Sequence, residues 1–429
     1  MRPAPGRSHA AKVAGAVPAR RWRVPASNGY RVGMSERKQR PTVAMIGNPT
    51  SDKGRGAMID ERVFALLADA GQRHGFDVID LTGASFDDSL ANARGHADAY
   101  DHLVVVGGDG MIALGANAVG NSGKPLGIVA IGSGNDFARG LKLPVNRIET
   151  AVEGIAGAVT RGSHIDVDMG HVRSLGGGGV DGPAIGADDG AQGGEAACVA
   201  TSCEMPDGAT AGETTRRTAQ PVDRYYAGML SCGIDASIND RANHSRLPNG
   251  SVRYMAAVLV ELTHMKRYGY HVKATLADGG VEERDIVSPM LTIANSRHIG
   301  GGIEVCPYSR FADGLLDVVW MDHVPNVAEC AGAIRNAYNG RLLASRVFGW
   351  QRVRAIEISR ADEGDQPPVL MADGEYVGRL PVRVEVCDRS LRVLVPPAVA
   401  QWHALQSEER VEAAVRRDGR DPESGAFIR

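Results

Sequence analysis

The chain has 429 residues, a formal net charge of −3 and 43% hydrophobic residues. Its length allows two or three domains, and its nearly balanced charge gives no electrostatic basis for nucleic-acid binding. No apolar run approaches the roughly 20 residues of a membrane-spanning helix. The six cysteines show no metal-ligand spacing, so we expect reduced thiols in a cytoplasmic protein.

Residues 1–40 form a basic segment in which Glu36 is the only acidic residue. The segment lacks the apolar stretch and the small-residue cleavage site of a signal peptide. We interpret it as a disordered basic extension, with Met34 as an alternative start. A basic arm that binds anionic lipid is the other interpretation.

Residues 41–161 alternate between short apolar strand patterns and amphipathic helix patterns. This alternation is typical of a parallel sheet with helices on its faces, and it predicts an α/β domain over this range. In such sheets, ligands bind beyond the carboxyl ends of the strands. The expected strands cover residues 43–46, 76–81, 103–106 and 126–131, and the expected helices cover residues 58–70, 86–94, 111–119, 135–140 and 148–161.

Glycine-rich turns follow three of these strands, at residues 48–54, 107–110 (Gly-Gly-Asp-Gly) and 132–136 (Gly-Ser-Gly-Asn-Asp). Glycine lets the backbone approach a polyanion closely, and a helix that begins there supplies free N–H groups. A lone turn of this kind is also explained by Asp109 acting as a helix cap. Two such turns side by side favour a phosphate site with carboxylates available for Mg²⁺. The dinucleotide-binding fingerprint and the Walker A motif are both absent from the sequence.

Residues 162–395 contain many short β-rich patterns, which predict a second, antiparallel domain built as a β-sandwich. Within this range, residues 173–222 hold few large hydrophobic residues, so we expect a disordered insertion. Residues 396–429 are expected to form a helical and charged tail. The expected strands cover residues 164–170, 225–234, 269–276, 289–295, 315–321, 353–358, 369–373 and 391–395, and the expected helices cover residues 251–267 and 327–344.

Two Asp-Gly turns in this second half carry further candidate residues. Asp313 is compatible with an ordinary Asx turn or with a hard-cation site completed by backbone carbonyl groups. Residues 373–375 read Asp-Gly-Glu, which is compatible with a hairpin turn or with Glu375 as a general base toward an attacking alcohol. The residues alone leave both pairs of alternatives open.

Together these segments resemble the diacylglycerol kinase catalytic-domain family, which includes bacterial lipid kinases related to sphingosine kinases. The resemblance covers residues 43 to about 395 apart from the insertion. It implies transfer of the γ-phosphoryl group of ATP to a lipid hydroxyl, with diacylglycerol and phosphatidic acid as the expected pair. It also implies an α/β nucleotide-binding domain and a β-sandwich domain around one cleft. The motifs that carry it are GNPTSDKGRG, VVVGGDGMIALGAN, GIVAIGSGNDFARGLKLP, CGIDASI, IANSRHIGGGIEVCP, FADGLLDV and MADGE.

The resemblance further implies roles for individual residues. Glu375 would accept the proton of the alcohol, and Asp109 and Asp136 would serve a catalytic Mg²⁺ or position the acceptor. In sphingosine kinases the aspartate of the glycine loop is itself proposed as the base, so the resemblance leaves Asp109 and Glu375 as alternatives for this role. A structural Mg²⁺ would be held by Asp313 and the carbonyl groups of Arg310 and Leu315. The residues implied to bind ATP are Asn48, Pro49, Thr50, Ser51, Asp52, Thr82, Gly107, Gly108, Asp109, Gly110, Met111, Ile112, Ala113, Ser133 and Asn135.

Met111 departs from the family pattern, because the family usually has threonine at this position. The loss of a hydroxyl near the phosphates predicts weaker ATP binding or a changed nucleotide preference. Two other functions are weighed: an NAD kinase, against which the Asn-Asp pair at residues 135–136 argues, and a catalytically silent lipid- or nucleotide-binding regulator. A kinase that acts on a membrane lipid is expected to make transient peripheral contact with the inner membrane face. A homodimer is compatible with the sequence, which holds no signal that decides the assembly.

Overall fold

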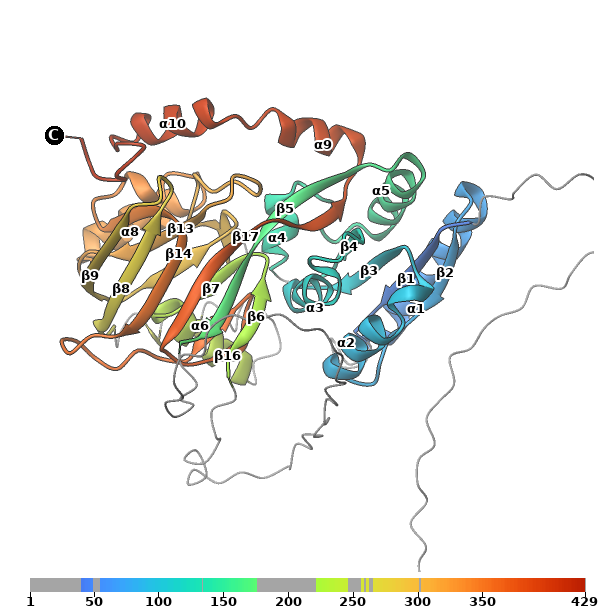
Figure 1. Ribbon diagram of the computed structural model, residues 1–429, viewed down its shortest axis with the longest axis horizontal. Coiled ribbons are helices and arrows are strands. Elements are labelled where there is room, and N and C mark those ends of the chain that lie inside the picture. The colour runs from blue at the N-terminus through green and yellow to red at the C-terminus, as the bar shows by residue number, and fades with distance from the viewer. Residues whose placement is uncertain are drawn as a thin grey trace, which may run out of the picture.

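The computed structural model describes residues 40–48, 55–132, 134–175, 221–245, 256–257, 260–261, 265–300 and 302–428. Helices flank a parallel sheet in the N-terminal half (Figure 1). The elements of this half are β1 (Thr42–Ile46), α1 (Arg55–His74), β2 (Asp77–Asp80), α2 (Phe86–Gly95), η2 (Ala97–Ala99), β3 (His102–Gly107), α3 (Asp109–Val119), β4 (Leu126–Ala130), α4 (Asp136–Gly140) and α5 (Ile148–Arg161). The strand order is β4-β3-β1-β2 with parallel pairing throughout, as the sequence predicts.

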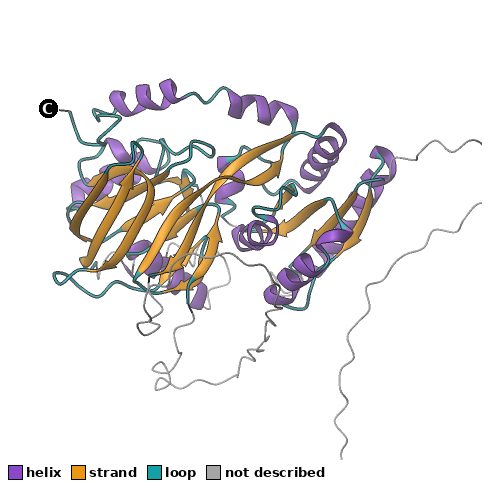
Figure 2. Ribbon diagram, viewed as in Figure 1, coloured by secondary structure: helices purple, strands orange, loops and turns teal. Residues whose placement is uncertain are grey.

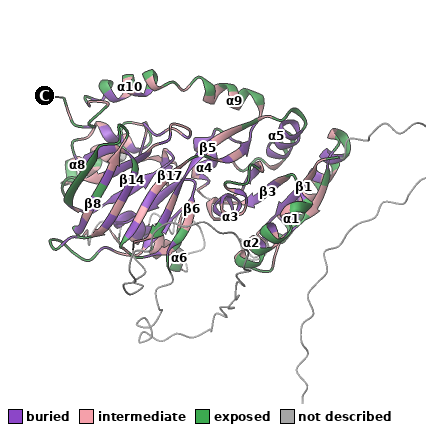
Figure 3. Ribbon diagram, viewed as in Figure 1, coloured by how far each residue is buried: buried purple, intermediate pink, exposed green. Residues whose placement is uncertain are grey.

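Alternating side chains of β1 contribute to two hydrophobic layers, one on each face of the parallel sheet. Val43 and Met45 pack in the layer that includes residues of α1 and α5. Ala44 and Ile46 pack in the layer that includes residues of α2 and α3. All four side chains are buried, because both faces of a parallel sheet are covered by helices. Figure 3 shows this burial along the strands. Because β1, β3 and β4 are parallel, their carboxyl ends meet at one edge of the sheet, where the glycine-rich turns begin.

Antiparallel strands dominate the second half (Figure 2). Its elements are β5 (His164–Ser174), β6 (Asp223–Tyr226), β7 (Met229–Ser231), α6 (Ile234–His244), β8 (Tyr268–Leu276), β9 (Val281–Ser288), β10 (Leu291–Ala294), β11 (His298–Ile299), β12 (Ile303–Glu304), β13 (Leu316–Met321), α8 (Val327–Ala337), η3 (Leu342–Ala344), β14 (Phe348–Arg360), β15 (Leu370–Ala372), β16 (Glu375–Gly378), β17 (Val382–Leu394), α9 (Pro397–Ala404) and α10 (Glu408–Arg417). One run of strands is β16-β15-β7-β10-β13-β14. Strands β8, β17 and β5 continue from β14, and side chains from both runs form one buried core. The predicted α/β half with a β-sandwich half is the fold that is observed.

The long strand β17 joins the two halves. It pairs with β14 and β5 in antiparallel fashion and with β4 in parallel through Val393 and Leu126. The pairing with β5 is interrupted between Cys387 and Leu391, where the register shifts. A single sheet of 15 strands consequently runs through both halves.

Several predicted boundaries in the second half are wrong. The strand expected at 225–234 is two strands, β6 and β7. Helix α6, which begins at Ile234, was not expected, because β-branched and apolar residues had favoured a strand there. Strand β9 was not expected, because its charged sequence suits the exposed edge that it occupies beside β8. Residues Arg173 and Ser174, assigned to the insertion, pair with β17, and Val222 is buried. Residues 176–220 and most of 251–267 lie outside the described residues.

Folded structure also begins one residue earlier than expected. Arg40, assigned to the extension, donates through Nη2 to the carbonyl groups of Gly71 (2.7 Å) and Phe76 (3.2 Å). Residues 1–39 lie outside the described residues. Within the part of the chain that is described, no helix combines the length and hydropathy that crossing a membrane requires.

The C-terminal segment packs across both halves (Figure 1). The Nε2 of His403 in α9 lies 3.2 Å from the carbonyl oxygen of Leu141, in the first half. Beyond α10, the Arg420 side chain is 1% exposed and donates to the carbonyl groups of Leu343, Phe348 and Gly425. These bonds satisfy a guanidinium that would otherwise be costly to bury.

Candidate functional site

The two glycine turns after β3 and β4 lie against each other. The N–H of Ile131 donates to the carbonyl of Gly107 (2.8 Å). A Cβ on Gly132 would lie 3.0 Å from the Cα of Gly108, so a side chain there would require the two backbones to move apart by a few tenths of an ångström. The turns that the sequence predicted to converge therefore do so, and glycine favours this close approach.

Asp109, the first residue of α3, is held by the second turn. Its Oδ2 accepts a hydrogen bond from the N–H of Asn135 (2.7 Å). Asn135 is fully buried in a left-handed conformation (φ 57°), and its Nδ2 donates to the carbonyl of Gly132 (2.8 Å). The other carboxylate oxygen of Asp109, Oδ1, is buried and has no hydrogen-bond partner in the described part of the chain. An uncompensated buried carboxylate oxygen is a fitting ligand for a hard cation.

Asp136, the first residue of α4, lies beside Asp109. A Cβ on Gly134 would lie 2.6 Å from Oδ2 of Asp109 and 3.4 Å from Oδ2 of Asp136, so the two carboxylates flank one glycine. Oδ1 of Asp136 accepts the N–H of Gly302 (2.9 Å), from the loop between β11 and β12. Burial, followed by repulsion from Asp136 and Asp373, raises the pKa of Asp109 to about 7.

Glu375 reaches this place from the second half. It is the first residue of β16, and its Oε1 would lie 2.8 Å from a Cβ placed on Gly110. The side chain is exposed, yet partial loss of hydration raises its pKa, with a smaller opposing effect from Arg224. The structure thus places the predicted catalytic carboxylates Asp109 and Asp136 side by side, and it brings Glu375, from a separate segment, against Gly110, the residue after Asp109.

Asp373 positions the turn that carries Glu375. Its Oδ1 accepts the N–H groups of Gly228 (2.8 Å) and Met229 (3.0 Å), and its Oδ2 accepts that of Ala227 (2.8 Å). A Cβ on Gly228 would lie 2.7 Å from Oδ1 of Asp373, so this position requires glycine. Three backbone donors fix the orientation of the Asp373 carboxylate and, with it, the start of β16.

Two asparagines connect the halves on either side of this cluster. Asn117 in α3 donates to the carbonyl of Tyr225 (2.9 Å) and accepts its N–H (3.2 Å), as a neighbouring strand would. Asn295 donates through Nδ2 to the carbonyl groups of Asp168 (2.7 Å) and Ala227 (2.8 Å). Asp109 at the start of α3 and the turn at Asp373 are therefore held in a fixed relation.

The edge near β1 and β2 contributes fewer described groups. Oγ1 of Thr82 accepts the N–H of Gly47 (2.9 Å), which joins the ends of the two strands. Asp60 in α1 lies beside Gly47, and burial raises its pKa to about 6, with Asn48 N–H opposing the shift. Asn48 itself lies at the end of β1. The predicted ATP-binding residues Pro49, Thr50, Ser51, Asp52 and Ser133 lie outside the described residues.

The residues that follow Gly110 turn their side chains into the core. Met111 and Ile112 are buried in the hydrophobic layer that contains α3, and Ala113 is buried as well. Met111 packs against Gly107, where a Cβ would lie 2.5 Å from its Cγ and where φ is +149°. The N–H groups of Met111 and Ile112 donate to the carbonyl of Gly108, whereas those of Asp109 and Gly110, also at the start of α3, have no acceptor among the residues that the structure describes.

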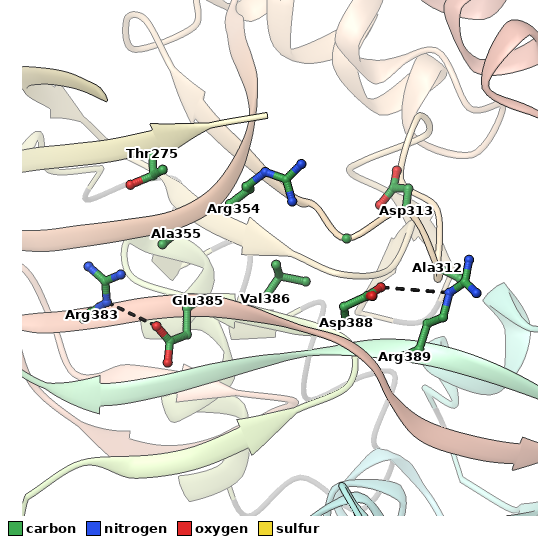
Figure 4. A pocket seen from close by; sticks show the side chains of 11 residues that line it. Thr275, Ala312, Asp313, Arg354, Ala355, Arg383, Glu385, Val386, Asp388 and Arg389 are labelled. Atoms are coloured by element: carbon green, nitrogen blue, oxygen red, sulfur yellow. Dashed lines mark hydrogen bonds and ion pairs between the residues drawn. The ribbon is translucent and has the colours of Figure 1, made fainter. Parts of the chain in front are cut away.

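The residues predicted to hold a structural metal lie elsewhere in the second half. Asp313 accepts the N–H of Leu315 (3.2 Å), and Arg310 forms an ion pair with Glu408 of α10. Figure 4 shows Asp313 on the wall of a cavity of about 620 Å³, across from Arg354. Burial, followed by repulsion from Asp317, raises the pKa of Asp313 to about 7. In the described part of the chain, no three His, Cys, Asp or Glu side chains are grouped as metal ligands.

Sequence reasoning did not single out four residues that organise the site: Asn117, Gly228, Asn295 and Asp373 as a positioning residue. Asn117, Asn295 and Asp373 each lie within one of the sequence motifs that carry the family resemblance. Their partners are backbone groups 68 to 146 positions away in the chain. No local pattern contains that information.

Comparison with known proteins gives two family matches. The diacylglycerol kinase catalytic domain matches residues 42–172, and the YegS C-terminal NAD kinase beta sandwich-like domain matches residues 228–395. A diacylglycerol kinase from Mycobacterium tuberculosis (strain CDC 1551 / Oshkosh) is 23% identical over 366 residues, which cover 85% of this chain and 98% of the relative. A diacylglycerol kinase from Staphylococcus carnosus (strain TM300) is 21% identical over 373 residues, which cover 86% of this chain and 100% of the relative.

A solved structure has the same fold. It is a Bacillus anthracis str. Sterne protein with a provisional diacylglycerol kinase assignment, and it superposes with a TM-score of 0.54 at 18% identity. The superposition covers 85% of this chain and 100% of the other. At this identity the likeness concerns the fold alone.

Proposed function

Because the chain belongs to the diacylglycerol kinase catalytic domain family of lipid kinases, carrying that domain together with a YegS C-terminal domain, we propose that it transfers the γ-phosphoryl group of ATP to the hydroxyl of diacylglycerol. One observation carries the proposal: Asp109, Asp136 and Glu375 gather from both halves around two touching glycine turns. This arrangement combines a phosphate cradle with acidic groups on one side of it.

The chain's own groups suit an in-line displacement. The N–H groups of Asp109 and Gly110 at the start of α3 bind phosphate oxygens, because helix N-termini favour anions. Glu375 accepts the proton of the attacking hydroxyl, and its raised pKa makes the carboxylate a stronger base near neutral pH. Asn135 fixes Oδ2 of Asp109, while Oδ1 has no hydrogen-bond partner among the described residues. In this proposal Glu375 is the base, and Asp109 holds the metal.

Mg²⁺ fits the donor set at this place. Oδ1 of Asp109 and the carboxylate of Asp136 would hold it, since both are the oxygen ligands that Mg²⁺ prefers. When bound, the ion neutralises negative charge on the phosphates. Binding of a dication also lowers the pKa of Asp109, because it offsets the repulsion from Asp136.

The acceptor is proposed as diacylglycerol, which the family assignment favours over other alcohols. Since this substrate lies in a bilayer, we infer transient contact of the protein with a membrane surface at the inner face. The second Mg²⁺, at Asp313 with the carbonyl groups of Arg310 and Leu315, is retained as a proposal for a structural ion.

A direct assay tests the proposal. Purified protein is incubated with labelled ATP and Mg²⁺, and diacylglycerol in mixed micelles and NAD are offered in separate reactions. We expect label in phosphatidic acid, and a Glu375→Gln variant that folds normally with kcat lowered about 10²- to 10⁴-fold. Glu409→Gln, a matched change at an exposed residue of α10, keeps the wild-type rate.

Other outcomes replace parts of the proposal. Label in NAD instead of lipid indicates the NAD kinase alternative. ATP binding without turnover on any alcohol of a total membrane lipid extract indicates a regulator that binds nucleotide. Full activity of Glu375→Gln removes the base assignment and leaves Asp109 as the remaining base.

A further inference from the structure

A cavity of about 380 Å³ lies beneath α9, on the side of α4 away from Asp136. Strand β5, the segment 309–312 and α9 supply most of its lining. Gly140, the last residue of α4, lines it as well. The volume falls within the range of small-molecule sites. None of its lining residues belongs to the proposed phosphate cradle or to the three catalytic carboxylates.

Aromatic and aliphatic side chains form much of the cavity wall. Phe311 and His403 pack edge to face with ring centroids 6.0 Å apart, and Trp402 and His403 do so at 4.8 Å. Ile165 and Val167 of β5 also line the cavity. A wall of this kind favours an apolar chain or ring over a fully polar ligand.

Arg297 brings a positive charge to this wall without a close counterion. Its Nε donates to the carbonyl of Ser309 (3.0 Å), and no carboxylate of the described residues lies within 4.0 Å of its guanidinium. Burial lowers the pKa of Arg297, while Glu304 and Asp317 oppose that shift from greater distances. A guanidinium that is partly desolvated and not paired favours an incoming anion.

The other charged groups of the cavity leave it with a positive balance. Arg310 lines it and is paired with Glu408 of α10. Arg389 lines it and lies 4.0 Å from Asp388 at an exposed position, which is a weak pairing. The acidic group among the described lining residues, Asp166, is already paired with Arg392 (2.8 Å). Lys142 lies over the ring of Trp402, 5.5 Å from its centroid.

We propose that this cavity binds an anionic amphiphile. Its carboxylate or phosphate oxygens would pair with Arg297, because a planar guanidinium matches both groups, and its apolar part would lie along Phe311 and Trp402. The proposal concerns binding at a site separate from the catalytic cleft and does not depend on the identity of the lipid that the protein phosphorylates.

Trp402 gives a local signal for the test. Dodecyl phosphate below its micelle concentration is titrated into the full chain in EDTA, and tryptophan fluorescence and calorimetric heat are recorded. We expect saturable binding that shifts the fluorescence. The fluorescence change is absent in Trp402→Phe, whereas the heat remains, because the reporter and not the site is removed.

Variants separate the charge from the apolar wall. Arg297→Met keeps side-chain length and is expected to weaken binding at least tenfold, whereas Arg335→Met on the exposed surface of α8 leaves it unchanged. Ala404→Trp, at an exposed lining residue of α9, blocks the cavity without disturbing the core and serves if Arg297→Met does not fold.

Inorganic phosphate and dodecyltrimethylammonium complete the comparison. Both are expected to bind at least tenfold more weakly than dodecyl phosphate. Equal binding of the cationic detergent, or unchanged affinity in Arg297→Met or Ala404→Trp, overturns the proposal. Equal binding of inorganic phosphate overturns the role of the apolar wall and thus the ligand class.

Discussion

The tripeptide Ala-Asp-Gly occurs at residues 312–314 and at residues 372–374, and the two copies have different surroundings. Both glycines have positive φ, +68° and +84°, so the local turn chemistry is shared. Asp373 accepts three backbone N–H groups from the segment 227–229. Asp313 accepts one, from Leu315, and its pKa rises to about 7 beside Asp317.

This difference shows what distant partners add to a local turn. A carboxylate that is saturated by backbone donors fixes the chain, and here it fixes Glu375, two residues further on, against Gly110. A carboxylate with one donor keeps oxygen lone pairs for another ligand. A third copy at residues 277–279 serves as a reference, because Asp278 is exposed and, among the described residues, accepts only the local N–H of Gly280 (2.8 Å).

The largest effect on stability is expected from Asp373→Asn. The amide places an N–H₂ where Oδ1 or Oδ2 accepts a backbone N–H, so at least one buried donor loses its partner. We expect unfolding free energy to fall by about 2 kcal/mol and kcat to fall more than tenfold, since Glu375 is displaced. Denaturant unfolding and the lipid kinase assay measure both. Asp278→Asn is the matched control and should change stability by less than about 0.5 kcal/mol.

A second test uses Asp109, whose carboxylate lies beside that of Asp136 at the two glycine turns. The folded-state pKa of Asp109 is about 7, above its value in an unfolded chain, so the folded state binds the extra proton between about pH 4 and 7. Stability contributed by Asp109 therefore falls as pH rises through this window. Asp109→Asn should be more stable than wild type by about 1–2 kcal/mol at pH 8 in EDTA and no more stable at pH 4, while lacking kinase activity.

A wild-type protein whose stability exceeds that of Asp109→Asn at pH 8 in EDTA would contradict this assignment. Added Mg²⁺ should reduce the difference in unfolding free energy between the two proteins, because the ion stabilises wild type and not the variant. Thermal unfolding across pH, with and without Mg²⁺, measures these effects.

Asp313→Asn tests the other turn and should have a smaller effect. Its pKa is raised in the same sense, so removing the charge is expected to stabilise the protein by about 1 kcal/mol at pH 8 in EDTA. If Asp313 holds a structural Mg²⁺, millimolar Mg²⁺ raises the Tm of wild type more than that of the variant. An equal Mg²⁺ response in both proteins assigns Asp313 to the turn alone.

The smallest effect is expected from Met111→Thr, which restores the residue usual in the family. A hydroxyl near the phosphates adds one hydrogen bond, so KM for ATP should fall about threefold with kcat nearly unchanged. The variant also loses the packing of Met111 against Gly107, and Tm should decrease slightly. A KM that does not change shows that the side chain at this position faces only the core.

The parallel half was predictable because its signals are local. Apolar runs and glycine turns fix each strand and its end, and β1, β3 and β4 follow the predicted ranges within about two residues. In the second half, β9 and α6 escaped detection. The charges of β9 suit an edge strand, and α6 follows β7 within three residues without a strong N-cap residue.

The candidate site was predictable to the same degree. Residues 107–110 and 132–136 and the Asp-Gly-Glu turn carry their chemistry in their own sequence, so Asp109, Asp136 and Glu375 could be named. The groups that bring them together, such as Asn117 with Tyr225 and Asp373 with Gly228, depend on contacts across more than a hundred positions. Neither the amino-acid composition nor the spacing of the motifs predicts such contacts.

Strand β17 has a mechanical consequence. It is continuous through both halves, paired with β4 at Val393 and with β14 and β5 along most of its remaining length. Because the two halves share this strand, they cannot separate by a hinge motion without bending it. The ladder is interrupted at the register shift between Cys387 and Leu391, where Arg389 has a φ of +45° and its N–H donates to Asp168 (2.7 Å), so we expect any bending of β17 to occur there. For the proposed kinase, we therefore expect nucleotide exchange to depend on movement of loops and not on separation of the two halves.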